Sequence, residues 1–122
     1  MYCVKKKQMK QTEQDKKEIY EAIFDIVRLI PSGRVTSYGA IAAAIGLRSG
    51  ARLVGYSMNF CQNAVPAVPA HRVVNSSGIL TGKFHFSPPE KMQQLLAKEG
   101  VSVKDDKVVE FKTVFWDPQL EL

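Results

Sequence analysis

Hydrophobic side chains recur at helical spacing through the first part of the chain. They lie at intervals of three and four, at Ile19, Ala22, Ile23, Ile26, Val27 and Ile30. This spacing places them on one face of a helix. Thr12 followed by Asp15 is typical of a helix start, and Pro31 and Gly33 are typical of a helix end. The pattern therefore predicts one amphipathic helix over about residues 13–30.

Two shorter helices are predicted next, separated by a tight turn. The stretch "YGAIAAAI" predicts a helix from Tyr38 to about Ile45, with Gly46 as its C-terminal stop. Ser49 is placed to cap a third helix through "GARLVGYSMNF". Two short helices and a tight turn favour a helix-turn-helix, although an ordinary helical hairpin fits the pattern equally well.

The second half of the chain mixes extended and helical patterns. Two prolines predict that "VPAVPAHRVV" is extended. The stretch "NSSG" predicts a turn and "ILTGKFHF" an irregular loop. Ser87-Pro88-Pro89-Glu90 predicts a capping box with proline at the first helical position, and Gly100 ends that helix. The stretch "VSVKDDKVVEF" predicts a β-hairpin. The fold class expected is mainly α with small β elements.

Length and composition indicate one small domain with an anionic partner. With 122 residues, we expect a flexible basic tail over residues 1–12 and a single domain over residues 13–122. No apolar run is long enough to cross a bilayer, and the N-terminal lysines precede no apolar segment. We therefore expect a cytoplasmic protein. The net charge of +5 favours nucleic acid as partner, although a merely basic protein is also consistent with it.

Cysteine and histidine are too sparse to indicate a metal centre. The chain has two of each, and Cys3 and Cys61 lie far apart without a zinc-ligand spacing. We expect no metal, no cofactor and no disulfide, with Cys61 as a small buried side chain. Nothing in the sequence indicates a dimerisation helix, so we expect a monomer.

The segment Pro69-Ala70-His71-Arg72 has the pattern of a catalytic site but lacks a nucleophilic atom. A cysteine at position 70 would be a nucleophile beside a base, whereas alanine has no reactive group. From these residues alone, the chain is either an enzyme that lost its nucleophile or a site that never needed one.

Four motifs in order resemble one known family. They are "IPSGRVTSYGAIAAAIG", "ARLVGYSM", "VPAHRVVNSSG" and "LLAKEG". From about Ile23 to Gly100 they resemble the C-terminal domain of O6-alkylguanine-DNA alkyltransferases. That family's acceptor motif is Pro-Cys-His-Arg-Val, and Ala70 stands at the cysteine position. The chain therefore looks like an alkyltransferase-like protein. The resemblance implies a winged-helix-like domain with a helix-turn-helix.

The resemblance also implies roles for the residues around position 70. In the transferases a cysteine thiolate accepts the alkyl group, a histidine relays its proton through water, and a glutamate orients the histidine. His71 and Glu99 match the last two positions. Without the sulfur no transfer can occur through Ala70, so this relay is a remnant. We expect His71 and Glu99 to be a buried pair that satisfies its own hydrogen bonds.

The family's DNA-binding residues match positions on the two short helices. Arg52 matches the arginine that enters the base stack in place of the extruded nucleotide, and Tyr38 the tyrosine that contacts that nucleotide's phosphate. Ala51 and Gly55 are small and would let the helix approach the minor groove. Without the resemblance, Tyr38 is equally a packing residue and Arg52 a solvated charge.

The lesion pocket is expected around the acceptor position. The resemblance implies that Ala70, Val73 and the loop after Gly78 line it, with the backbone carbonyls of Ala70 and Val73 reading the base edge. The loop lacks the family's Ser-Gly-Gly pattern. Phe84, His85 and Phe86 shape the pocket in one interpretation and cover the core in another.

These observations together predict a non-enzymatic DNA repair protein. We expect it to bind O6-alkylguanine in double-stranded DNA by base flipping. The resemblance implies that it then marks the lesion for nucleotide-excision repair proteins. Two alternatives stay open: an active or decayed methylated-DNA–cysteine methyltransferase, with Cys61 as a possible acceptor, and a sequence-specific DNA-binding regulator.

Overall fold

The computed structural model describes residues 13–47 and 49–121. The long amphipathic helix α2 spans Glu13–Arg28, and a tightened turn continues it to Ile30, whose amide donates to the Val27 carbonyl. The predicted helix is therefore confirmed to within two residues at its C-terminus. Its proposed start at Thr12 lies outside the described residues.

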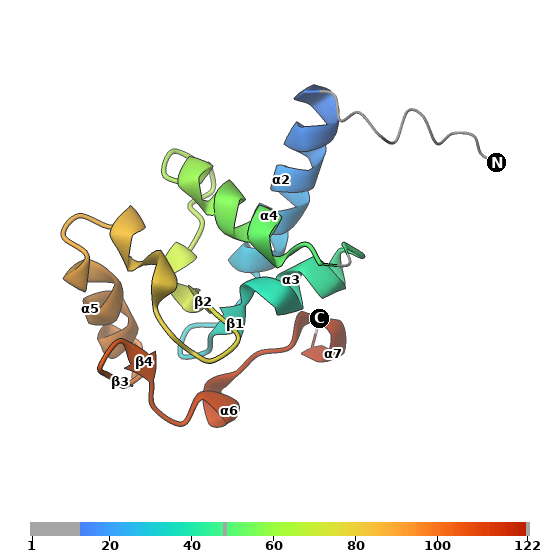
Figure 1. Cartoon of the computed structure of the whole chain (residues 1–122). Helices are drawn as coiled ribbons and strands as arrows, with labels where there is room; N and C mark the ends of the chain where they lie inside the picture. Colours follow the sequence, from blue (N-terminus) through green and yellow to red (C-terminus); the bar gives the residue numbers. More distant parts are fainter. Residues whose placement is uncertain (1–12, 48, 122) are drawn as a thin grey trace.

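Two short helices pack across α2 in the order predicted. Strand β1 (Thr36–Ser37) leads directly into α3 (Tyr38–Ala44), and the hydroxyl of Ser37 caps α3 by accepting from the Ala40 amide. Helix α4 (Ala51–Ser57) follows and runs into the short 3-10 helix η1 (Met58–Phe60). In Figure 1, α2, α3 and α4 lie together on one side of the molecule. This arrangement confirms the helical pair.

The predicted cap of α4 at Ser49 is wrong. Gly50 is the N-cap, with no side-chain hydrogen bond, and its carbonyl accepts the first helical bond from Val54. Ser49 has a φ of 59°, in the left-handed region, whereas a capping residue takes an extended backbone. The left-handed backbone at Ser49 therefore accounts for the failure of the predicted cap.

The middle of the chain is less extended than predicted. The 3-10 helix η2 (Ala70–Arg72) interrupts the stretch and leads into β2 (Val73–Val74). Strand β2 pairs in parallel with β1, Thr36 opposite Val73. The predicted irregular loop contains a further 3-10 helix, η3 (Thr81–His85). The predicted turn is confirmed, because the Gly78 amide donates to the Asn75 carbonyl at 2.9 Å.

The predicted capping box before α5 is also wrong. Helix α5 spans Glu90–Lys98, so Pro89 flanks the helix and no side chain caps it. Because Pro89 has no amide hydrogen, a hydroxyl at Ser87 lacks one of the two donors that an N-cap uses. Gly100, with a φ of 86°, follows the helix as predicted.

The C-terminal part forms the predicted hairpin and two short helices. Strands β3 (Val103–Lys104) and β4 (Lys107–Val108) pair antiparallel. The two residues between them are aspartates with φ of 54° and 63°, as the favoured two-residue hairpin turn demands. Helices α6 (Phe111–Val114) and α7 (Pro118–Glu121) follow.

Two apolar clusters hold the domain together. One joins α2, α3 and α4 to Trp116 near the C-terminus, and the other joins α5 to β4 and the end of β2. The β1–β2 pair lies between them, because Val73 belongs to the first cluster and Val74 to the second. Residues on η2, directly before this pair, are therefore held between the two halves of the core.

Candidate functional site

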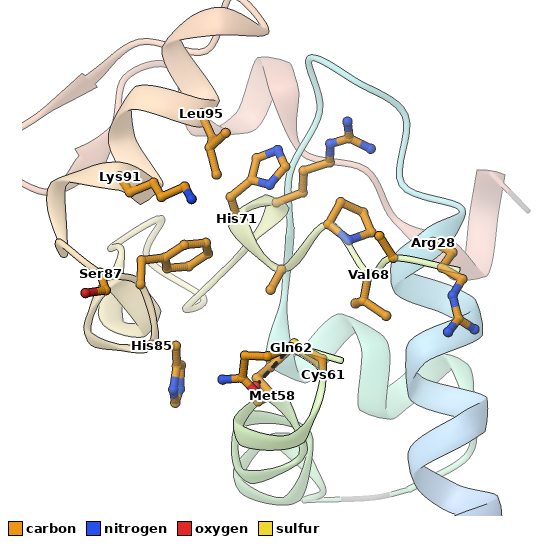
Figure 2. Close-up of a pocket in the computed structure, with 15 residues that line it drawn as sticks. Arg28, Met58, Cys61, Gln62, Val68, His71, His85, Ser87, Lys91 and Leu95 are labelled. Carbon is orange, nitrogen blue, oxygen red and sulfur yellow. Dashed lines mark hydrogen bonds between the residues drawn. The ribbon is translucent and has the colours of Figure 1, made fainter. Parts of the chain in front are cut away.

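The turn η2 places Ala70 at the wall of a cavity. The Val73 amide donates to the Ala70 carbonyl and closes the turn, and Pro69 fixes the backbone before it. The cavity has a volume of about 710 Å³. Its walls come from the end of α2, from η1, from the segment 67–72, from the loop after η3, and from α5 (Figure 2). Five separate parts of the chain therefore converge on the alanine that the sequence singled out.

Behind η2, one carboxylate is shared by two neighbouring side chains. Glu99 Oε2 lies 2.9 Å from His71 Nε2, and Arg72 donates to both carboxylate oxygens, at 3.0 Å from Nε and 2.6 Å from Nη2. Arg72 Nη1 also donates to the carbonyl of Ile30 at 2.8 Å. The structure thus brings His71 and Glu99 together as expected. Sequence spacing did not indicate that Arg72 makes more hydrogen bonds to this carboxylate than His71 does.

The charge of Glu99 is strongly favoured in the folded protein. Burial raises the pKa of Glu99, but hydrogen bonds from Arg72 and His71 and the charges of both outweigh it. The net effect lowers this pKa from 4.5 to about 2. The side chains of His71, Arg72 and Glu99 are all at least four-fifths buried. The cluster therefore fixes η2 to the end of α5 at every pH near neutrality.

Tyr38 is half-buried at the start of α3, with its hydroxyl bonded to the Thr81 side chain. Burial raises the pKa of Tyr38, and this hydrogen bond opposes the increase. A Cβ on Gly82 would lie 2.9 Å from the Tyr38 hydroxyl, so η3 approaches the tyrosine closely. A Cβ on Gly55 would lie 3.8 Å from the same ring, so this glycine faces the tyrosine as well.

Ala51 and Arg52 are exposed on the first turn of α4. Within the described part of the chain, the Arg52 side chain makes no hydrogen bond or ion pair, in contrast to Arg28, Arg34 and Arg72. Its side chain is therefore available to a partner molecule.

Cys61 lies in the cavity wall, a position that its sequence context did not reveal. It is 7% exposed, and its thiol donates to the Met58 carbonyl at 3.3 Å. Burial raises the pKa of the Cys61 thiol, which disfavours the reactive thiolate. The expectation of a small buried side chain is confirmed, but this side chain shares a cavity with Ala70.

The expected lining of the pocket needs one correction. Val73 is 1% exposed in the core and does not line the cavity, because β2 turns its side chain inward. Of the aromatic loop, His85 and Phe86 line the cavity. Phe84 is 75% exposed, and the Lys83 ammonium lies 5.2 Å from its ring centroid. The loop therefore shapes the pocket through two of its three residues.

Over the residues that the structure describes, no three histidine, cysteine or acidic side chains are grouped to hold a metal ion. None of the helices in the same residues has the length and apolar character needed to cross a membrane.

Comparison with known proteins places this site in a family. Residues 18–101 match the family described as 6-O-methylguanine DNA methyltransferase, DNA binding domain. Alkyltransferase-like protein 1 of Schizosaccharomyces pombe is 35% identical over 95 residues, which cover 78% of this chain and 87% of that protein. A methylated-DNA–protein-cysteine methyltransferase of Mycolicibacterium paratuberculosis is 38% identical over 82 residues, which cover 67% of this chain and 48% of the relative.

A solved structure agrees with the sequence relatives. The crystal structure of S. pombe Atl1 in complex with damaged DNA containing O6-carboxymethylguanine has a TM-score of 0.73 and 31% identity. The match covers 82% of this chain and 95% of that one. Fold and sequence therefore agree: the chain belongs to the family of the 6-O-methylguanine DNA methyltransferase DNA-binding domain, with alkyltransferase-like proteins among its relatives.

Proposed function

We propose that this protein binds O6-alkylguanine in double-stranded DNA, flips the base into the cavity beside Ala70 and holds it without removing the alkyl group. The observation that carries the proposal is a methyl group at the acceptor position, beside an intact His71–Glu99 pair. The bound complex would mark the lesion for nucleotide-excision repair proteins, and the protein would act as a monomer. The relative in complex with damaged DNA supports the choice of ligand.

The side chain at position 70 favours binding of the alkylated base over transfer of its alkyl group. Alkyl transfer needs a nucleophile with a lone pair, and the alanine methyl has none. The apolar methyl instead leaves space in which an alkyl group is favourably buried, at about 0.8 kcal/mol for each CH₂. His71 and Glu99 then serve to hold η2 in place rather than to move a proton.

Base flipping requires groups that offset the loss of stacking, which costs a few kcal/mol. Arg52 is exposed on α4 and carries a long planar cation that can stack and hydrogen-bond in the vacated space. We expect the Tyr38 hydroxyl, which lies next to Thr81, to contact the phosphate of the flipped nucleotide.

A second candidate function is alkyl transfer to Cys61, because that thiol lines the same cavity. Its raised pKa and its hydrogen bond to a backbone carbonyl both disfavour it as a nucleophile. Intact-mass measurement after incubation with O6-methylguanine DNA decides between the two. We expect no adduct. An adduct that disappears in Cys61→Ala would establish the transferase instead.

The variant Arg52→Ala tests the flipping step. We expect it to lose most of the preference for an O6-methylguanine duplex over plain guanine, while weak salt-sensitive binding remains. Lys112→Ala is the matched control, because Lys112 is an exposed cation on α6, distant from α4 in Figure 1. Equal lesion preference in Arg52→Ala and the control would refute the role of Arg52. Preference for a DNA sequence rather than a modified base would favour a regulator.

A further inference from the structure

Two neighbouring aromatic rings are exposed at the C-terminal end of α4 and on η1. Tyr56 is 56% exposed and Phe60 is 53% exposed. The two rings meet edge to face, with centroids 5.4 Å apart and an angle of 71° between their planes. Single exposed hydrophobic side chains need no explanation, whereas a contiguous exposed group indicates a contact surface.

Tyr56 shares the outward side of α4 with Arg52. Val54 and Met58 are buried in the core, so the opposite side of the helix faces away from it. Arg52 and Tyr56 are four residues apart on that side, and both are exposed. Four residues advance an α-helix by about 6 Å, which is about two of the ~3.4 Å steps between base pairs. A duplex that lies along α4 and meets Arg52 therefore meets Tyr56 one or two base pairs further on.

A row of aromatic rings connects Tyr56 to the core. Phe60 stacks on Tyr20 of α2, with centroids 5.7 Å apart and an angle of 16° between the planes. Tyr20 in turn lies 6.4 Å from the ring of Phe24, which is buried. The Tyr56 ring thus rests on a fixed support while its outer surface is open. Binding therefore immobilises this side chain at a small cost in conformational entropy.

The other residues beside Arg52 permit a close approach to the minor groove of DNA, because Ala51 and Gly55 are small. Tyr56 is the bulky apolar residue there, and its flat ring can enter a groove about 6 Å wide edge-on. A·T pairs present only acceptors on the groove floor, whereas a G·C pair adds the amino group of guanine. An apolar ring edge against that amino group would remove water from a donor without replacing its hydrogen bond.

We propose that Tyr56 reads the base pairs beside the lesion from the minor groove and disfavours a guanine amino group there. The inference rests on the proposed function, because Arg52 must enter the base stack before Tyr56 meets the neighbouring pairs. The protein then discriminates between flanking sequences around one and the same lesion. The effect is confined to one side of the lesion, because Tyr56 lies on the C-terminal side of Arg52 along α4.

The test varies the base pairs beside a fixed O6-methylguanine. On each side in turn, the two adjacent pairs are G·C or I·C, where I is inosine, which lacks only the amino group that guanine places in the minor groove. The measured quantity is the dissociation constant with G·C divided by that with I·C, from fluorescence anisotropy at fixed salt. Wild type is compared with Tyr56→Ala, because any cost of opening the stronger G·C pairs is common to both proteins.

On one side of the lesion, we expect the wild-type ratio to exceed that of Tyr56→Ala about fivefold, the lower end for one unfavourable base pair. On the other side, the two proteins should give equal ratios. Tyr56→Phe keeps the ring and should keep the wild-type ratio. Val109→Ala is the matched control and should keep it as well, since Val109 is exposed and follows β4, which is distant from α4 in Figure 1.

Equal ratios in wild type and Tyr56→Ala on both sides overturn the inference. If the dissociation constants are also unchanged, the two exposed rings are left as a surface for a protein partner. If every duplex loses affinity equally, Tyr56 is a contact to the DNA backbone. A difference on both sides, or a ratio lost in Tyr56→Phe, overturns the inference too, because the helix direction or the ring would not be responsible. Failure of the proposed function is recognised separately, as equal wild-type binding of O6-methylguanine and guanine duplexes.

Discussion

Replacing Glu99 by glutamine removes the charge that connects η2 to α5. The carboxylate accepts from Arg72 at both oxygens and lies 2.9 Å from His71, so an amide would turn its NH₂ group toward at least one donor. The difference between 4.5 and about 2 in the pKa of Glu99 corresponds to about 3 kcal/mol. Solvent screening of the partly exposed group reduces this, and we expect a loss of about 2 kcal/mol in the free energy of unfolding.

This loss has a defined pH dependence. The pKa of Glu99 is lower in the folded than in the unfolded state, so its stabilisation is complete above pH 4.5 and disappears as the pH falls toward 2. Urea unfolding followed by circular dichroism, at pH 7, 4 and 2.5, measures it. The stability difference between wild type and Glu99→Gln should be about 2 kcal/mol at pH 7, with a decrease in Tm of about 8 °C, and should shrink steadily below pH 4.5.

Glu90→Gln is the control for this measurement, because Glu90 is exposed in the first turn of the same helix. It should change stability by no more than about 0.5 kcal/mol. An equal effect of the two substitutions, or a Glu99 effect that is constant from pH 7 to 2.5, would refute the argument that a charged network holds η2.

Three further substitutions test the site itself. Tyr38→Phe removes the hydroxyl near Thr81 and should weaken binding of the O6-methylguanine duplex by about threefold to tenfold; unchanged affinity would make Tyr38 a packing residue. Gly82→Ala places a Cβ 2.9 Å from that hydroxyl and should weaken binding by a similar factor. Gly39→Ala is the control, because nothing lies within 4 Å of its Cβ, and it should leave the affinity unchanged. Equal affinities of the two variants would show that η3 shifts to accommodate the added methyl group. Ala70→Cys should restore alkyl transfer, seen by mass spectrometry as an adduct at position 70. The absence of an adduct would mean that the relay is misaligned.

The helices and the hairpin could be predicted because their signals are local. The apolar spacing from Ile19 to Ile30 and the pair Asp105–Asp106 each act within a few residues of chain. The caps proposed at Ser49 and Ser87 failed because capping depends on the backbone path into the helix, which a residue type does not determine.

The walls of the cavity could not be predicted from spacing alone. Arg72 and Glu99 are 27 residues apart, and Arg28, Cys61 and Lys91 come from three distant parts of the chain, so only the packed fold brings them together. The resemblance to a family identified His71 and Glu99 as a pair. It gave no signal that Arg72 donates to the same carboxylate, which only the packed structure shows.

The most direct test of the central claim is the affinity of the wild-type chain for two duplexes that differ only in one base, O6-methylguanine or guanine. Fluorescence anisotropy across a salt series separates phosphate binding, which weakens steeply with salt for both duplexes, from recognition of the base. A lesion-binding protein should prefer the modified duplex by at least about tenfold, near 1.4 kcal/mol, and keep this preference as salt rises. Coincident curves at every salt concentration would contradict the account and leave a general DNA-binding domain.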